Sequence, residues 1–169
     1  MRRNLLWWML HRRDELVLRT SRCELTPLVP ADIPSLLPLF TSPAVRQFLG
    51  GVIPPEEAEA RLNRWCSLPY YWTVRTGDDC IGLVDLSPYH DPQKTELSYQ
   101  FLPAYWGQGY ALETLSAVLG WCRGRYDSVV SETQEANIRS CRLLERLGYR
   151  LTDRLERFGV LQRLYEKNL

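Results

Sequence analysis

The sequence predicts a single α+β domain, and three observations lead to this fold class. The chain has 169 residues, which is enough for one hydrophobic core, and no change of composition marks a second domain. Apolar segments of strand length are interspersed with segments whose apolar residues recur at helical spacing. A tight turn with two glycines, Gly107 and Gly109, joins one predicted strand to one predicted helix. We expect residues 20–169 to form the domain, after an N-terminal extension of residues 1–19.

The elements of the first half follow from apolar spacing and from prolines and glycines that interrupt it. Pro27 and Pro30 stop the first strand, and a glycine at 77 lies in the turn of a hairpin. The predicted elements are, in order, a strand over 23–28, helices over 31–39, 42–49 and 54–65, and hairpin strands over 70–75 and 80–86. A turn-rich loop over 87–94 ends this half.

The elements of the second half are predicted from the same signals. Gly148 is a natural stop for the helix before it, because glycine readily adopts the left-handed conformation that ends helices. The final two strands turn near Phe158 and Gly159. The predicted elements are a strand over 95–102, a helix over 110–123, a strand over 128–133, a helix over 137–147, and strands over 149–157 and 160–166.

Composition narrows the possible partners and the compartment. A formal net charge of +1 argues against general affinity for nucleic acid or anionic membranes. Five scattered cysteines without a Cys-x-x-Cys pair, with only two histidines, make a metal site improbable and fit reduced thiols in the cytoplasm.

No apolar segment is long enough to span a bilayer. The apolar run Leu5–Leu10 is too short for a signal peptide, and charged residues follow it. We expect this run to dock on the domain or on a second subunit of a homodimer; a frayed extension is the alternative.

The stretch from Tyr99 to Ala111 contains the most informative motif. It reads as an apolar strand, a tight loop with two glycines and the start of a helix. The first N–H groups of a helix have no partner within it, so such a junction suits a phosphate or pyrophosphate. A Walker loop is excluded because Gly-Lys-Ser/Thr is absent, and a Rossmann fingerprint fails at Leu112. The alternative is a turn that binds nothing.

Four stretches together resemble the GNAT superfamily of N-acetyltransferases, in particular its ribosomal-protein-alanine N-acetyltransferase-like branch. They are Thr20–Leu25, Ser42–Val45, Tyr105–Ala111, and Asn137–Ser140 with Leu144–Tyr149. The resemblance covers nearly the whole chain from Thr20 to Leu169. It implies a mixed, mostly antiparallel sheet of six to seven strands flanked by about four to five helices, and acetyl-CoA as co-substrate without a metal.

The resemblance also implies where the coenzyme binds. Backbone N–H groups of the glycine loop would hold the pyrophosphate, and the strand before the loop would pair with the pantetheine amides where it splays from the 128–133 strand. The expected cofactor-binding residues are Phe101, Leu102, Trp106, Gly107, Gln108, Gly109, Tyr110, Ala111, Asn137, Ser140 and Arg142. Asn137 is equally suited to cap the following helix. Arg139 and Arg142 would meet the 3′-phosphate or form a solvated helix face.

Acetyl transfer needs a neutral amine, a donor for the oxyanion and a means of stabilising the departing thiolate. Glu96 is the candidate base, acting through water, against the alternative of a solvated charge at a strand end. Many family members place a tyrosine where this chain has Leu144, so Ser140 is the candidate for stabilising or protonating the thiolate. Its alternative is a serine that merely bonds the backbone.

The sequence therefore predicts an acetyl-CoA-dependent N-acetyltransferase that works by direct attack in a ternary complex. The acceptor would be a primary amine, either a protein or peptide N-terminus or a small molecule. Aromatic residues between the third helix and the hairpin either line the acceptor pocket or pack in the core; they are Trp65, Tyr70, Tyr71 and Trp72. A non-catalytic acyl-CoA-binding sensor or assembly module on the same fold is the alternative function.

Overall fold

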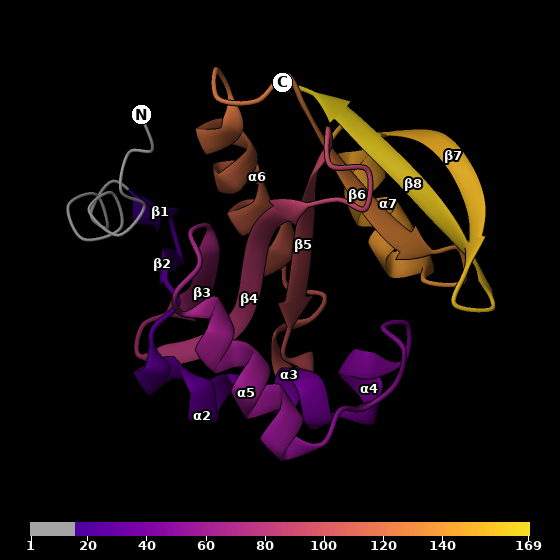
Figure 1. Cartoon of the computed structure of the whole chain (residues 1–169). Coiled ribbons are helices and arrows are strands. Elements are labelled where there is room, and N and C mark those ends of the chain that lie inside the picture. Colours follow the sequence, from indigo (N-terminus) through magenta and orange to yellow (C-terminus); the bar gives the residue numbers. More distant parts are fainter. Residues whose placement is uncertain (1–15) are drawn as a thin grey trace, which may run out of the picture.

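An eight-stranded sheet organises residues 16–169, the part of the chain that this computed structural model describes. The strands are β1 (Leu18–Arg19), β2 (Glu24–Pro27), β3 (Tyr71–Thr76), β4 (Asp79–Pro88), β5 (Thr95–Phe101), β6 (Ser128–Gln134), β7 (Arg150–Arg157) and β8 (Val160–Asn168). Their order in the sheet is β1-β2-β3-β4-β5-β6-β8-β7. All neighbours are antiparallel except β5 and β6, which run parallel. The expected mixed, mostly antiparallel sheet is confirmed (Figure 1).

The expected number of six to seven strands is wrong, because the short strand β1 is an eighth strand of the sheet. Leu18 pairs with Leu25 and Arg19 with Glu24, so residues that we assigned to the extension form an edge of the sheet. A strand of two residues has no alternation that a sequence pattern can reveal. The predicted docking run Leu5–Leu10 lies outside the described residues.

Helices before β3 cover one face of the sheet. They are η2 (Pro30–Asp32), α2 (Ile33–Leu36), α3 (Pro38–Thr41), α4 (Pro43–Arg46) and α5 (Pro55–Trp65). The helix expected over 31–39 is interrupted at Leu37, because Pro38 starts a new helical segment and a proline has no N–H to continue the ladder. The helix expected from Ser42 is a single turn, since its chain turns back through Gly50 and Gly51, both at positive φ.

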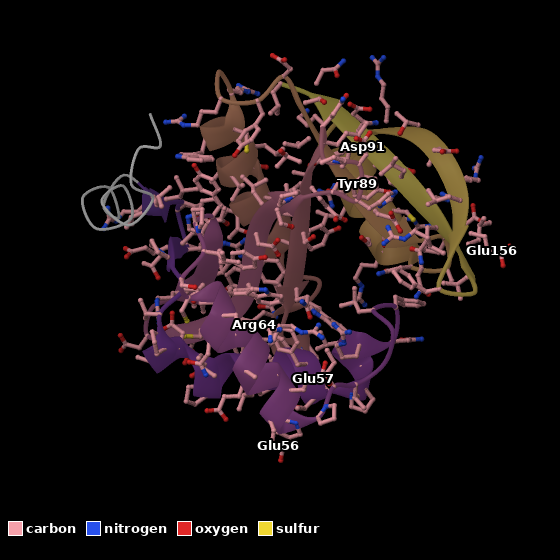
Figure 2. The ribbon with its side chains drawn as sticks, viewed as in Figure 1. Glu56, Glu57, Arg64, Tyr89, Asp91 and Glu156 are labelled. Atoms are coloured by element: carbon pink, nitrogen blue, oxygen red, sulfur yellow. The ribbon has the colours of Figure 1, made fainter. Side chains whose placement is uncertain are left out.

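A hydrophobic core, which we call the second core, lies between these helices and the sheet. It joins Leu36, Phe40 and Leu62 to Tyr71 and Leu83 of the strands. The opposite side of α5 is solvated, and Glu56 and Glu57 point away from the sheet (Figure 2).

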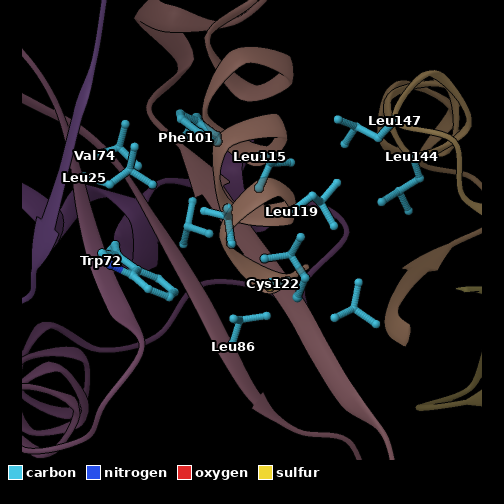
Figure 3. Packing of buried hydrophobic residues seen from close by; sticks show 14 of the residues in the cluster. Leu25, Trp72, Val74, Leu86, Phe101, Leu115, Leu119, Cys122, Leu144 and Leu147 are labelled. Atoms are coloured by element: carbon cyan, nitrogen blue, oxygen red, sulfur yellow. The ribbon is translucent and has the colours of Figure 1, made fainter. Parts of the chain in front are cut away.

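The main core lies on the other face, under α6 (Tyr110–Cys122) and α7 (Ile138–Arg146). Leu115, Leu119 and Cys122 of α6 pack toward Trp72 and the strands around it (Figure 3). The residues that α7 and its C-terminal turn contribute to this core include Leu144 and Leu147. The apolar stripes predicted for both helices are therefore the buried faces, except that Ile138, expected on the stripe of α7, is exposed at the start of that helix.

Strands β5 and β6 separate soon after they meet. The only registered pair between them is Glu96 with Val130, and beyond it the Ser131 hydroxyl donates to the Leu97 carbonyl at 2.7 Å. We call the divergence of β5 and β6 beyond Glu96 and Val130 the splay. A splay at the single parallel junction leaves backbone groups of β5 without a neighbouring strand.

Among residues 16–169, no helix is long and apolar enough to cross a bilayer. Within the same residues, no group of three or more His, Cys, Asp and Glu side chains could hold a metal ion. Cys23, Cys122 and Cys141 are buried as free thiols.

Candidate active site

The glycine loop places a cluster of backbone N–H groups at the start of α6. A 3₁₀ turn, η3 (Pro103–Tyr105), leads into Gly107 at φ 72° and Gly109 at φ 84°, and Gly109 is the N-cap. A Cβ built at Gly107 would meet no atom within 4 Å, so the backbone there is open to a ligand. Within residues 16–169, no acceptor takes the N–H groups of residues 107–112. A 13-residue helix adds its positive end to this cluster.

Arg22 braces the loop from the opposite side, a role that the sequence did not reveal. Its Nη1 donates to the Gln108 carbonyl at 2.9 Å, and its guanidinium lies 4.3 Å from the centre of the Tyr110 ring. Its Nε also donates to the Glu113 carboxylate at 2.7 Å. The Thr20 hydroxyl and Arg22 together lower the pKa of Glu113 to about 2. The first-turn carboxylate is thus neutralised by an ion pair, which reduces its repulsion of an anionic ligand.

The end of β5 connects the loop to the splay. The Trp106 indole N–H donates to the Phe101 carbonyl at 2.8 Å, and the Arg139 guanidinium lies 4.8 Å from the Trp106 ring centre. The Leu102 N–H is directed to the Ile81 carbonyl of β4, so this group of a predicted coenzyme residue is already paired. Because backbone groups alternate sides along a strand, those of Leu97, Tyr99 and Phe101 face β6, as the bond from Ser131 to the Leu97 carbonyl shows.

The start of α7 brings Asn137 and Ser140 to the splay. The Asn137 Oδ1 accepts from the Ser140 N–H at 3.2 Å, which is the helix cap that the sequence allowed. The Ser140 Oγ lies 2.6 Å from the Tyr99 Oη of β5 and not against a backbone carbonyl. Arg142 is exposed on the outer side of α7, and Leu144 is fully buried in the main core. Of the predicted α7 residues, Ser140 and Asn137 therefore lie together, and Arg142 lies apart.

Glu96 lies at the root of the splay, on the sheet face that carries α2–α5. Register pairs it with Ser87, and Leu83 on the same face of β4 packs in the second core. The Glu132 N–H lies 3.4 Å from the Glu96 Oε1. Burial raises the pKa of Glu96 to about 7, and the Glu132 charge adds to the rise. A carboxyl with this pKa can accept and release a proton near neutral pH.

Two further polar residues on this face were not predicted as site residues. Asp85 pairs with Ser98 across the strands, and burial raises its pKa to about 7, with the Glu96 charge contributing. The Gln100 Oε1 is buried and has no hydrogen-bond partner among residues 16–169. We call Asp85, Glu96, Ser98 and Gln100 the polar face. A two-residue period along the 95–102 strand puts three of them on one face, whereas Asp85 lies in a strand predicted from its apolar residues.

The aromatic residues suggested for the acceptor separate onto both faces of the sheet. Trp65 stacks on Tyr71 at 4.9 Å between ring centres, beside the polar face. Trp72 is fully buried in the main core on the other face, where Tyr70 also packs. Core packing therefore accounts for Trp72 and Tyr70, whereas Trp65 and Tyr71 border the polar face.

Comparisons with known proteins identify the family. The family model for the acetyltransferase (GNAT) domain matches residues 22–150. A GNAT-family acetyltransferase from Bacillus anthracis superposes with a TM-score of 0.80 at 17% identity, over 90% of this chain and 98% of that one.

The names of two similar structures also state which protein those enzymes acetylate. An acetyltransferase from Salmonella typhimurium that modifies the N-terminal serine of ribosomal protein L7/L12 gives a TM-score of 0.76 at 16% identity, over 90% and 99% of the two chains. A structure of RimL, the ribosomal L7/L12 α-N-protein acetyltransferase, in complex with coenzyme A gives a TM-score of 0.76 at 17% identity, over 90% and 98%. These likenesses show the fold, and the family model spans well over half of the sequence. The chain therefore belongs to the GNAT acetyltransferase family.

Proposed function

We propose that this protein is an acetyl-CoA-dependent N-acetyltransferase that passes the acetyl group directly to a primary amine in a ternary complex. The observation that carries the proposal is the arrangement along β5, which has an open N–H cluster at one end and a titratable carboxyl at the other. Phe101 lies five positions after Glu96 on the strand, a distance of about 17 Å. That span suits an extended pantetheine arm between a pyrophosphate in the loop and a thioester near Glu96. The coenzyme A complex of RimL supports the same ligand.

The residues of this chain divide the binding between them. The N–H groups from Gly107 to Ala111 would hold the pyrophosphate, with Arg22 holding the loop in shape; the Trp106 N–H is already paired with the Pro103 carbonyl. The β5 edge facing the splay would pair with the pantetheine amides. Asn137 would support the arm indirectly, because its side-chain oxygen is engaged in capping α7.

An ammonium acceptor loses two protons during the transfer, and the charges that form on oxygen and sulfur must be stabilised. Glu96 takes the first proton from the ammonium, through water, and leaves the nitrogen with a free electron pair. The nitrogen attacks the carbonyl carbon, and a β5 N–H group donates to the oxyanion. The nitrogen then loses its second proton to solvent, the C–S bond breaks, its electron pair goes to sulfur, and Ser140 donates a hydrogen bond to the thiolate.

The acceptor is a primary amine, with a peptide N-terminus or a small amine as the two candidates. The polar face favours a cationic group, because Asp85 and Glu96 have no basic residue registered opposite them on β4 and β5. The printed substrate of the Salmonella relative, an N-terminal serine, supports a peptide acceptor.

A screen of amines and short peptides with acetyl-CoA tests the proposal by measuring release of free thiol. We expect acceptor-dependent release and an acetylated amine in the product. Silence across a broad library, with coenzyme binding intact, would identify the acyl-CoA-binding sensor instead.

The role of Glu96 is tested with the best acceptor by Glu96→Gln. We expect kcat/KM to fall by about 100-fold at neutral pH, because the amide cannot accept the proton. The wild-type rate should rise through pH 7 as Glu96 ionises, and this rise should vanish in the variant. Affinity for acetyl-CoA should stay unchanged. Glu156→Gln on the exposed strand β7 is the control, and equal losses in both variants would refute the assignment.

A further inference from the structure

A second hydroxyl lies directly behind the proposed thiolate-stabilising residue. Tyr99 projects from β5 toward α7, packs against the main core, and places its Oη 2.6 Å from the Ser140 Oγ. The sequence suggested that the loss of a tyrosine at the position of Leu144 left Ser140 to act alone. In the structure a phenol reaches Ser140 from the strand.

The hydrogens of this pair can be counted. Two hydroxyls carry two hydrogens, and the bond between them uses one. Among residues 16–169, neither oxygen has another hydrogen-bond partner. If the phenol donates, the second hydrogen stays on Ser140, in the first turn of α7 and beside the splay. If Ser140 donates, the second hydrogen stays on a phenol that faces the core.

A phenol is a stronger hydrogen-bond donor than an aliphatic hydroxyl, which favours Tyr99 as the donor to Ser140. Burial raises the pKa of Tyr99 to about 12, so the hydrogen that it donates is present at neutral pH. The Asn137 Oδ1 accepts from the Ser140 N–H and so fixes the serine backbone beside Tyr99. The positive end of α7 also favours an anion at this helix start over one in the core.

We propose that Tyr99 is a positioning residue for thioester cleavage: it donates to the Ser140 Oγ and thereby directs the Ser140 hydrogen toward the departing sulfur. The inference rests on the proposed function. The C–S electron pair goes to sulfur, which accepts a hydrogen bond and no proton. The first proton of the ammonium leaves through Glu96 and the second leaves the nitrogen to solvent after the attack, so the atoms and charges balance. Full proton transfer from a phenol to a thiolate would be uphill, since a free thiol has a pKa near 8.5.

The bound thiol itself reports this arrangement without any acceptor. The thiolate of coenzyme A is titrated by its ultraviolet absorption, as the difference between the complex and the protein alone. In the wild type we expect the pKa of the bound thiol to fall below its solution value by about one unit, which is a tenfold gain in thiolate. Ser140→Ala should abolish the shift, and Tyr99→Phe should remove most of it. Ser140→Thr keeps a hydroxyl and should restore it.

A double variant separates positioning from simple packing. Tyr99→Phe in the Ser140→Ala background should change nothing further, because Tyr99 acts through Ser140. Tyr126→Phe removes a phenol oxygen beside Trp121 at the far end of α6 and should leave the thiol unaffected. With an acceptor, Tyr99→Phe should lower kcat about tenfold and leave the KM for acetyl-CoA unchanged.

The outcomes distinguish this inference from the proposed function. If coenzyme A does not bind the wild type, the proposed function fails with it. If coenzyme A binds and acetyl transfer proceeds, but the thiol titrates identically in the wild type and Tyr99→Phe, only the role of Tyr99 is refuted. Additive effects of Tyr99→Phe and Ser140→Ala would refute it equally.

Discussion

The surroundings of the two carboxyl groups of the polar face determine their pKa values. Asp85 and Glu96 lie on adjacent strands and the same face, and burial raises the pKa of each to about 7. The Glu96 charge also opposes ionisation of Asp85, and the Glu132 charge opposes ionisation of Glu96. Such a pair holds a proton that surface carboxyls would have lost, which is useful only where a proton is moved or a cation is bound.

Asp85→Asn should therefore stabilise the protein in a pH-dependent way. The unfolded carboxyl ionises near 3.8 and the folded one near 7. Between these values folding takes up a proton, so wild-type stability falls as pH rises through this window and stays low above it. The neutral amide avoids the loss. We expect a gain of about 1 to 3 kcal/mol at pH 8 and almost none at pH 3.5.

Thermal denaturation of both proteins across this range measures the difference. Asp78→Asn, in the exposed hairpin turn, should show no such dependence. If Asp85→Asn stabilised the protein equally at both pH values, the gain would not come from the ionisation of Asp85.

At the scale of elements, the glycine loop determines whether the coenzyme binds. Gly107→Glu should abolish coenzyme binding, because the side chain would enter the open space over the N–H cluster and repel the pyrophosphate. Gly124→Glu is a matched control: Gly124 has φ 73° against 72° for Gly107 and equally open surroundings, but it lies in the turn after α6. Both variants should lose about 1 to 2 kcal/mol of stability through backbone strain.

Calorimetric titration with coenzyme A compares the two variants. Loss of binding in Gly107→Glu alone assigns the effect to the loop. Loss in both, or in neither, would contradict the phosphate cradle.

The sequence predicted elements well where a local signal was strong. The loop before Tyr110 and the capped helix after Asn137 follow from glycine, asparagine and apolar spacing, and both are present. Pro38 is a sequence signal for the interruption of the 31–39 helix, but the apolar spacing favoured one continuous helix. Through-space relations were not accessible: the contact of Tyr99 with Ser140 depends on how α7 packs, and the pairing of Asp85 with Ser98 depends on strand register.

At the scale of the whole molecule, ligand binding should appear as stability. Acetyl-CoA at 100 times its Kd should stabilise the protein by about 2.7 kcal/mol, because only the native state binds it. For a chain of this size that corresponds to a Tm increase of roughly 5 to 10 °C. Acetylated pantetheine without the diphosphate, at equal concentration, should give a much smaller increase. Equal shifts from both compounds would show that the glycine loop does not bind the diphosphate.

The splay has a consequence for the mechanics of the molecule. Strands β1–β5 and β6–β8 are two halves of one sheet, registered to each other at Glu96 and Val130 and otherwise joined by side-chain contacts, such as the Ser131–Leu97 bond, and by packing against α6 and α7. A pantetheine chain in that gap would serve as an additional, non-protein strand between the halves. Each departure of the product would remove it, so the stiffness of the sheet would rise and fall once in every turnover.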